Sequence, residues 1–188
     1  MKKYTIEELK SQFLLNKHTW FKDINFVGIR STANLPNQFD DLFGIINKDT
    51  IEWFTCTTNA GTHWLKNLLN SKGTALLKPA QYVDTWKIGM HQGKYEAFCQ
   101  IKPVTVYRDK NFNDKAEESL VTDTGLFGIN IHRSNATGKT MVIYNWSAGC
   151  QVFQVKTDHD QLMSICNSYK SKVNNKFTYT LLREKYLC

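Results

Sequence analysis

The feature that most constrains the fold of this chain is a series of short stretches rich in β-branched and aromatic residues. Gly, Asn, Asp and Pro separate them, which is the pattern of strands joined by turns. The expected strands are residues 24–30, 51–57, 82–90, 104–107, 127–132, 140–144, 150–155 and 177–182. Helical patterns do not alternate regularly with these strands, which argues against a doubly wound sheet. We therefore expect a mainly β fold, a β-sandwich or barrel-like core with peripheral helices near the N- and C-termini.

The expected helices lie at the two ends of the sequence, with a shorter one near residues 64–69. Residues 5–17 place apolar side chains at helical spacing, and Thr5 followed by Glu8 resembles a capping box. Residues 158–172 predict a second helix, with Asp158 as its cap.

The chain has 188 residues, of which 41% are hydrophobic and 13% aromatic, enough for one packed domain and too many for a disordered chain. We expect a single domain over residues 1–188. It would comprise an N-terminal helical segment (1–20), a β core (21–157) and a C-terminal helix and strand (158–188).

The net charge of +7 favours polyanionic surroundings such as nucleic acid, an anionic membrane face or a cell-wall polymer. The same net charge also fits a soluble protein whose Lys-rich surface is simply solvated. Glu7 and Glu8 interrupt the stretch in which a signal peptide would need apolar residues, and no apolar run approaches a membrane span. We expect synthesis in the cytoplasm without a signal peptide, no membrane insertion, and no nucleic-acid partner, because no nucleic-acid-binding motif is present.

Five cysteines are present, an odd number without a Cys-x-x-Cys pair, so neither a disulfide framework nor a zinc ribbon is expected. Three of them have apolar neighbours and are expected in the core, namely Cys56, Cys99 and Cys166. Cys188 ends the sequence and is expected to be frayed. Three histidines, His18, His63 and His159, fit no ligand spacing, and we expect no metal and no other cofactor.

The remaining cysteine, Cys150, follows Ser147-Ala148-Gly149 at the start of an expected strand, and another expected strand ends on His132. If these strands are neighbours, the imidazole can take the thiol proton and return it to a leaving group. Small residues before Cys150 allow a tight turn that exposes N–H groups, which can stabilise an oxyanion. From the residues alone, the pair of His132 and Cys150 is explained equally well by a structural histidine and a cysteine that only begins a strand.

A strand ending in His132, followed by a loop and then Ser147-x-Gly149-Cys150, resembles the catalytic domain of the L,D-transpeptidase (YkuD-like) family. The resemblance covers about residues 125–155; upstream, residues 57–62 are similar to the family's Thr-Pro-x-Gly turn without its proline. It implies that Cys150 is the acylated nucleophile, His132 its base and Ser147 a brace for the loop. The N–H groups of Gly149 and Cys150 would hold the oxyanion.

The resemblance also implies a substrate, a peptidoglycan stem peptide attacked between the L-centre of a diamino acid and a D-amino acid. Arg133 would orient His132 through its backbone carbonyl. Two positions depart from the family pattern. Ala148 stands where His or Lys is frequent, and Val152 where Arg or Asn is frequent. These departures favour a divergent member, a hydrolase rather than a transferase.

Further substrate-binding candidates are His91, Arg133, Arg30 and Arg108, because guanidinium groups bind carboxylates bidentately. A turn histidine and surface ion pairs are the alternatives. Three aromatic residues could line a groove or pack in the core, namely Tyr82, Trp86 and Trp146.

The leading hypothesis is a cysteine peptidase of the cell wall, an L,D-carboxypeptidase or endopeptidase, which suits a phage lysin (endolysin) or a virion-associated enzyme. The alternatives are a non-catalytic cell-wall-binding module on the same fold and nucleic-acid binding by charge. The oligomeric state stays open.

Overall fold

The computed structural model describes residues 2–187, in which eight strands close into a barrel of order β1-β11-β5-β6-β9-β10-β3-β2. They are β1 (Ile24–Arg30), β2 (Asp41–Asn47), β3 (Thr50–Thr57), β5 (Gln81–His91), β6 (Tyr95–Gln100), β9 (Ile131–Arg133), β10 (Gln151–Phe153) and β11 (Phe177–Arg183). A separate sheet has the order β4-β7-β8, formed by β4 (Thr74–Leu77), β7 (Val104–Asp109) and β8 (Thr122–Gly125). The predicted fold class, mainly β with helices near the termini, is confirmed.

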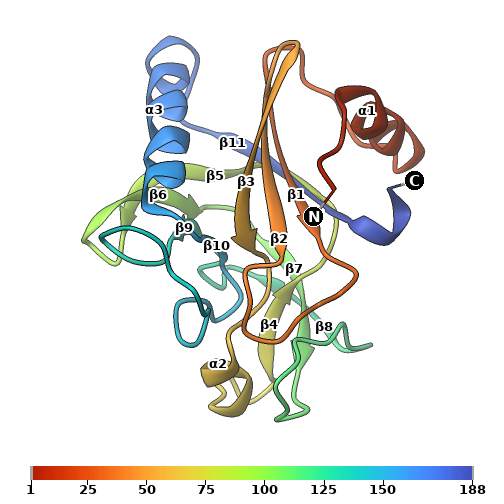
Figure 1. Cartoon of the computed structure of the whole chain (residues 1–188), viewed down its shortest axis with the longest axis vertical. Helices are drawn as coiled ribbons and strands as arrows, with labels where there is room; N and C mark the ends of the chain where they lie inside the picture. Colours follow the sequence, from red (N-terminus) through yellow and green to blue (C-terminus); the bar gives the residue numbers. More distant parts are fainter. Residues whose placement is uncertain (1, 188) are drawn as a thin grey trace.

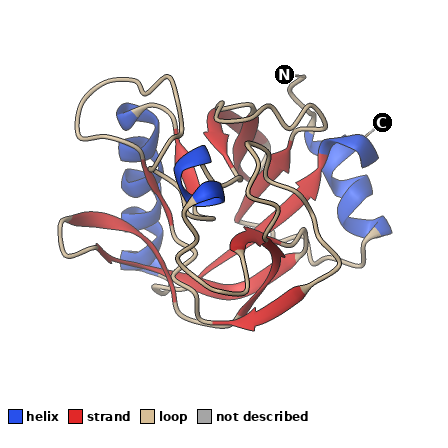
Figure 2. Ribbon diagram, turned by 90° about the horizontal axis from the view of Figure 1, so that it is seen from below, coloured by secondary structure: helices blue, strands red, loops and turns tan. Residues whose placement is uncertain are grey.

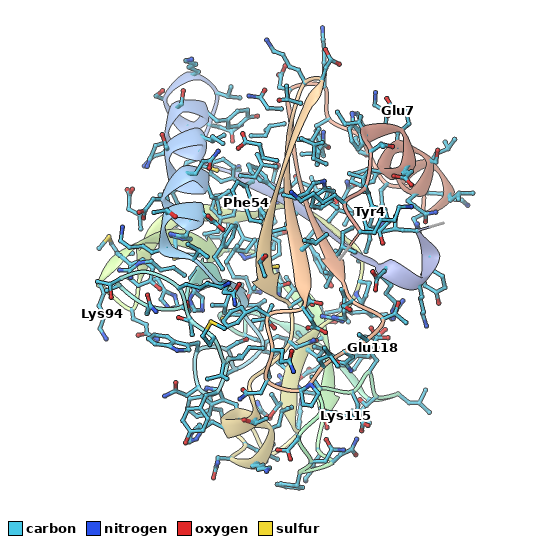
Figure 3. The ribbon with its side chains drawn as sticks, viewed as in Figure 1. Tyr4, Glu7, Phe54, Lys94, Lys115 and Glu118 are labelled. Atoms are coloured by element: carbon cyan, nitrogen blue, oxygen red, sulfur yellow. The ribbon has the colours of Figure 1, made fainter. Side chains whose placement is uncertain are left out.

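The helices are α1 (Ile6–Leu15), α2 (Thr62–Lys66), α3 (Lys156–Lys172) and the short 3-10 helix η1 (Glu184–Tyr186). α1 and α3 lie on opposite sides of the barrel, while α2 and the small sheet lie at one of its ends (Figures 1 and 2). Lys94, at the β5–β6 turn, is on the far side of the barrel from Glu7 on α1 (Figure 3). None of the helices in residues 2–187 is both long and apolar enough to cross a membrane.

The capping box at the start of α1 is confirmed. The Thr5 hydroxyl accepts the Glu8 N–H, and the Glu8 carboxylate accepts the Thr5 N–H. The predicted Asp158 cap of α3 is wrong, because this helix already begins at Lys156, with Val155 at its N-cap and no side-chain cap bond. Asp158 lies in the first turn instead, where a carboxylate complements the helix dipole.

Several predicted strands need correction. Of residues 127–132, only the end belongs to β9, because the N–H groups of Phe127 and Ile129 donate to the Gln100 side chain rather than to a strand ladder. Residues 140–144 form no strand; the Ile143 N–H donates to the loop carbonyl of Asn37. β2, β4, β6 and β8 were not predicted.

The barrel interior holds the main core. Trp86 and Tyr179 are fully buried there, and Tyr82 packs edge-on against Trp86. Tyr82 and Trp86 are thus core residues rather than the lining of a groove. Cys56 and Cys166 are core residues as predicted, whereas Cys99 is only half-buried; these thiols are free, and Cys188 lies outside the described residues.

The C-terminal strand completes the barrel, since β11 lies between β1, to which it is parallel, and β5. The barrel therefore includes residues beyond the expected 21–157 core. On the other side of the barrel, β9 and β10 are parallel neighbours, with Val152 opposite His132. This pairing positions the residues of the candidate site.

Candidate active site

The parallel pairing of β9 and β10 brings His132 and Cys150 to one face of two adjacent strands. Val152 pairs with His132, and Cys150, two residues earlier, shares its face by the period-two alternation of a strand. The Gln151 N–H donates to the Asn130 carbonyl at 2.9 Å, so the ladder extends back to Cys150. Strand spacing and rise place the Cα atoms of Cys150 and His132 about 8 Å apart. Side chains at this distance reach each other when their rotamers turn inward.

The sulfur of Cys150 contacts the segment that precedes β9. It accepts a hydrogen bond from the Asn130 N–H and donates one to the Gly128 carbonyl, both at 3.4 Å. Within residues 2–187, no hydrogen bond joins the sulfur to the His132 ring. Burial raises the pKa of the Cys150 thiol to about 11, although the Asn130 N–H opposes this. Cys150 therefore rests as a neutral thiol.

The loop before Cys150 is braced from inside. The fully buried Ser147 hydroxyl donates to the Cys150 carbonyl at 2.9 Å and accepts the Gly149 N–H at 3.2 Å. The Gly149 N–H is thus engaged, while the Cys150 N–H donates to no acceptor within the described chain. Gly149 has φ +122°, and a Cβ there would lie 2.4 Å from the Ala75 carbonyl oxygen. Only glycine fits this position, which lets the loop pass close to β4.

A second segment holds this loop from outside. The Gly61 N–H donates to the Ser147 carbonyl at 2.9 Å, and the Trp64 indole N–H donates to the Asn145 carbonyl at 2.9 Å. A Cβ on Gly61 would lie 2.0 Å from the Tyr144 carbonyl oxygen. Residues 57–62, which resemble the family turn, thus lie directly against the loop of the candidate nucleophile.

The His132 ring is buried and has a defined tautomer. Its Nδ1 lies 2.8 Å from the Arg133 carbonyl oxygen, which can only accept, so Nδ1 carries the proton and Nε2 is bare. The Tyr95 hydroxyl donates to the same carbonyl at 3.1 Å. Burial, followed by the neighbouring His91, lowers the pKa of His132 to about 3. His132 therefore rests as a neutral imidazole with no hydrogen on Nε2, and burial disfavours its protonated form.

His91, at the end of β5, lies next to this ring. The two imidazoles stack with centroids 4.2 Å apart and an interplanar angle of 16°. The Asn130 side-chain nitrogen lies 3.0 Å from His91 Nδ1. His91, which the sequence offered as a substrate-binding residue, thus belongs to the surroundings of His132.

Two cavities open at the site. One of about 340 Å³, the thiol cavity, is lined by Cys150, Ala148, Gly128, Phe127 and Arg108, among others. The other, of about 450 Å³, is the imidazole cavity, whose lining includes His132, His91, Arg133, Asn145 and Trp146. The loop over residues 145–150 contributes to both, so a substrate lying across this loop would contact both.

The three candidate arginines lie in different places. Arg108 is buried in the thiol cavity, where it pairs with Asp123 at 3.1 Å, and its buried Nε has no partner. Arg133 lines the imidazole cavity, with its guanidinium 4.0 Å from the Tyr95 ring centroid. The structure does not bring Arg30 to the site. This residue donates to Thr58 and Leu77 and lines a separate cavity.

Two residues of the site were missed by sequence reasoning. Asn130 contacts the sulfur of Cys150 through its backbone and His91 through its side chain, and Tyr95 holds the Arg133 carbonyl. Asn130 occupies a polar position of the alternation over residues 127–132, two residues before His132 and on the same face, which was a usable signal. Nothing around Tyr95 in the sequence distinguishes it.

Comparisons with protein-family models, with curated proteins and with solved structures found no match. Within residues 2–187, no group of three or more His, Cys, Asp or Glu side chains is arranged to hold a metal ion.

The resting thiol makes a direct prediction about its reactivity. Alkylation of Cys150 by iodoacetamide should accelerate with pH up to about 11, because only the thiolate reacts and burial disfavours it. At pH 7 we expect a rate about 300-fold below that of an exposed cysteine, whose pKa is about 8.5, because the thiolate fraction is smaller by that factor. Mass spectrometry of the peptide containing Cys150 gives the rate at each pH. An inflection below pH 8 would show a thiolate already activated at rest.

Proposed function

We propose that this protein is a cysteine-dependent enzyme of the cell wall that cleaves peptidoglycan stem peptides through a thioester on Cys150. The observation that carries this proposal is the parallel pairing of β9 and β10, which puts Cys150 and a His132 ring with a bare Nε2 on one face. The likeness of the His132 to Cys150 segment to the L,D-transpeptidase family supplies the substrate class, L,D peptide bonds.

In the acylation step, the Cys150 side chain turns from Gly128 toward His132. The sulfur attacks the scissile carbonyl carbon, and the thiol proton passes to His132 Nε2. The Cys150 N–H stabilises the oxyanion of the tetrahedral intermediate. The C–N bond then breaks, and the proton moves from Nε2 to the leaving amine. A thioester and a free amino group result.

In the second step, water is the acyl acceptor, and His132 takes its proton as it attacks the thioester. The C–S bond breaks, the sulfur regains a proton and a carboxylic acid leaves. We favour water over an amine, and hence an L,D-carboxypeptidase or endopeptidase, because the site departs from the transpeptidase pattern at Ala148 and Val152. Val152 is fully buried against Phe39 and Ile143 and offers no polar group to a substrate.

Arg108 can supply a positive charge in place of the basic residues that are frequent in the family at the positions of Ala148 and Val152. It reaches the thiol cavity from β7 and stacks its guanidinium 4.5 Å from the Phe127 ring centroid. In the resting structure this guanidinium donates to the Gly73 carbonyl and the Asp123 carboxylate and its Nε is buried, so it would have to shift to meet a carboxylate of the stem peptide. The net charge of +7 suits an anionic wall polymer, consistent with a phage lysin or a virion-associated enzyme that is made in the cytoplasm and acts on the wall.

One observation favours a second function, a non-catalytic cell-wall-binding module. The Cys150 sulfur is engaged by Gly128 and Asn130 rather than by His132, and its pKa is raised. Such a module would bind sacculi equally well with or without the thiol.

Digestion of purified sacculi distinguishes the cell-wall enzyme from the non-catalytic binding module. The enzyme is expected to release new muropeptides, identified by mass spectrometry, that have lost a D-amino acid or a cross-link at an L,D bond. Binding without any change in the muropeptides would favour the module. Neither binding nor cleavage would reject peptidoglycan as the partner.

A further inference from the structure

The tautomers of His91 and His132 are fixed in opposite senses by their neighbours. The Asn130 side-chain oxygen accepts the Gln100 backbone N–H at 2.9 Å, so the Asn130 nitrogen must be the atom 3.0 Å from His91 Nδ1. That nitrogen donates, so His91 Nδ1 is bare and its proton lies on Nε2. In His132 the proton lies on Nδ1, because the Arg133 carbonyl accepts it.

A protonated His91 does not fit this arrangement. A second ring proton on Nδ1 would point at the Asn130 amide hydrogens, and turning the amide would leave the Gln100 N–H without its acceptor. The contacts of Asn130 thus hold His91 as a neutral ring beside the candidate base.

The charged and titratable groups around the stacked rings act in the same direction. Lys94 and Arg133 line the cavity with them, Tyr95 lies beside His91 and His159 faces the pair from α3. Burial, followed by the charge of Lys94, lowers the pKa of His91. Another positive charge at His91 would therefore be disfavoured.

We propose that His91 is a positioning residue for catalysis, a neutral ring that holds the plane of the His132 imidazole so that Nε2 faces the sulfur of Cys150. The stack at 4.2 Å and 16° supplies the restraint, because face-to-face contact leaves the His132 ring little freedom to tilt. The neutral face of His91 also stays next to His132 when that ring carries the thiol proton, where a cation would oppose the transfer.

Asn130 joins this restraint to the nucleophile. Its side chain fixes His91, and its backbone N–H contacts the Cys150 sulfur at 3.4 Å. One residue thus contacts both the resting sulfur of Cys150 and the ring that stacks on His132. His91 has this role only if His132 is the base, so the assignment rests on the proposed function.

The first test uses the unmodified protein and needs no substrate. Nuclear magnetic resonance of ¹⁵N-labelled histidine reports which ring nitrogen carries the proton. We expect His91 protonated on Nε2 and His132 on Nδ1, each as a single tautomer between pH 6 and 8. A proton on His91 Nδ1, or averaged tautomers at His132, would overturn the assignment.

The second test compares His91→Ala with His91→Phe, which keeps a flat ring without nitrogen atoms. We expect His91→Ala to lower kcat for stem-peptide cleavage about 10- to 100-fold with KM changed less than about twofold, because misplacing a catalytic group by 1 Å costs about this much. His91→Phe should recover most of the loss. The His132 signal should become averaged in His91→Ala and stay single in His91→Phe.

These outcomes separate the two proposals. If the protein cleaves no stem peptide, the proposed function fails, while the tautomers can still be measured. If it cleaves and His91→Ala keeps both kcat and the single His132 tautomer, His91 has no positioning role. Should His91→Ala fail to fold, a His91→Phe variant that folds but has lost activity would overturn the stacking role as well.

Discussion

Replacing Cys150 by alanine is expected to lower the rate of stem-peptide cleavage by about 10⁴-fold or more, to the level set by binding and the oxyanion donor alone. The half-buried thiol lines its cavity without bearing on the barrel core, so the fold should persist. Release of muropeptides from sacculi, followed over time, measures the loss.

Cys99→Ala is the matched control, because Cys99 is the other half-buried thiol within residues 2–187 and lies on β6, outside the lining of the thiol cavity. It should keep the parent rate. Equal cleavage by the Cys150→Ala variant would remove Cys150 from the chemistry. Equal binding by Cys150→Ala, together with an inactive parent protein, would favour the non-catalytic module.

Replacing Trp86 by alanine is expected to lower the free energy of unfolding by about 3–5 kcal/mol. Trp86 is fully buried in the barrel, where its ring meets Tyr82 and Tyr179 edge-on with centroids 6.0 and 5.7 Å away. Its indole N–H also donates to the Ile129 carbonyl at 2.7 Å. The variant leaves both a cavity and a buried carbonyl without its donor. Urea denaturation followed by circular dichroism measures the change.

Trp86→Phe separates the two contributions, since it keeps most of the ring and removes the donor. We expect it to cost about 1–3 kcal/mol. Trp146→Ala is the control, because this indole is 41% exposed and should change stability by less than about 1 kcal/mol. A loss at Trp86→Ala no larger than at Trp146→Ala would contradict the described core.

The fold class followed from local patterns, whereas the wrongly assigned segments are held by contacts from elsewhere in the chain. The capping box of Thr5 and Glu8 was predictable because four successive residues define it. β2 was missed because it begins with Asp41, a fully buried carboxyl that is held by the N–H groups of Ser31 and Thr58. These partners come from segments that are distant in the sequence. In the sequence alone, Asp41 therefore resembled a loop residue.

The apolar run over residues 140–144 was misread for the opposite reason. Met141, Val142 and Tyr144 are exposed by half or more, although their composition is that of a strand. These residues belong to the loop that leads to Cys150, and the hydrogen bond of Ile143 to Asn37 holds the segment outside the barrel.

The candidate site was predictable only in part. The strands expected at His132 and Cys150 could lie side by side, and β9 and β10 do pair. The ring stacked on His132 and the groups that hold it come from β5, β6 and the segment before β9, and no short sequence pattern encodes contacts between them. The raised pKa of the thiol depends on its burial, which the sequence near Cys150 did not reveal.

Acylation of Cys150 is tested most directly by rapid acid quenching after the protein is mixed with a stem tetrapeptide. Intact-protein mass spectrometry should show the mass of the acyl fragment left after loss of the terminal D-amino acid. The adduct should map to the peptide containing Cys150, be released by hydroxylamine and be absent from Cys150→Ala. Cleavage of the tetrapeptide with Cys150 unmodified throughout, or an adduct on another cysteine, would contradict the account.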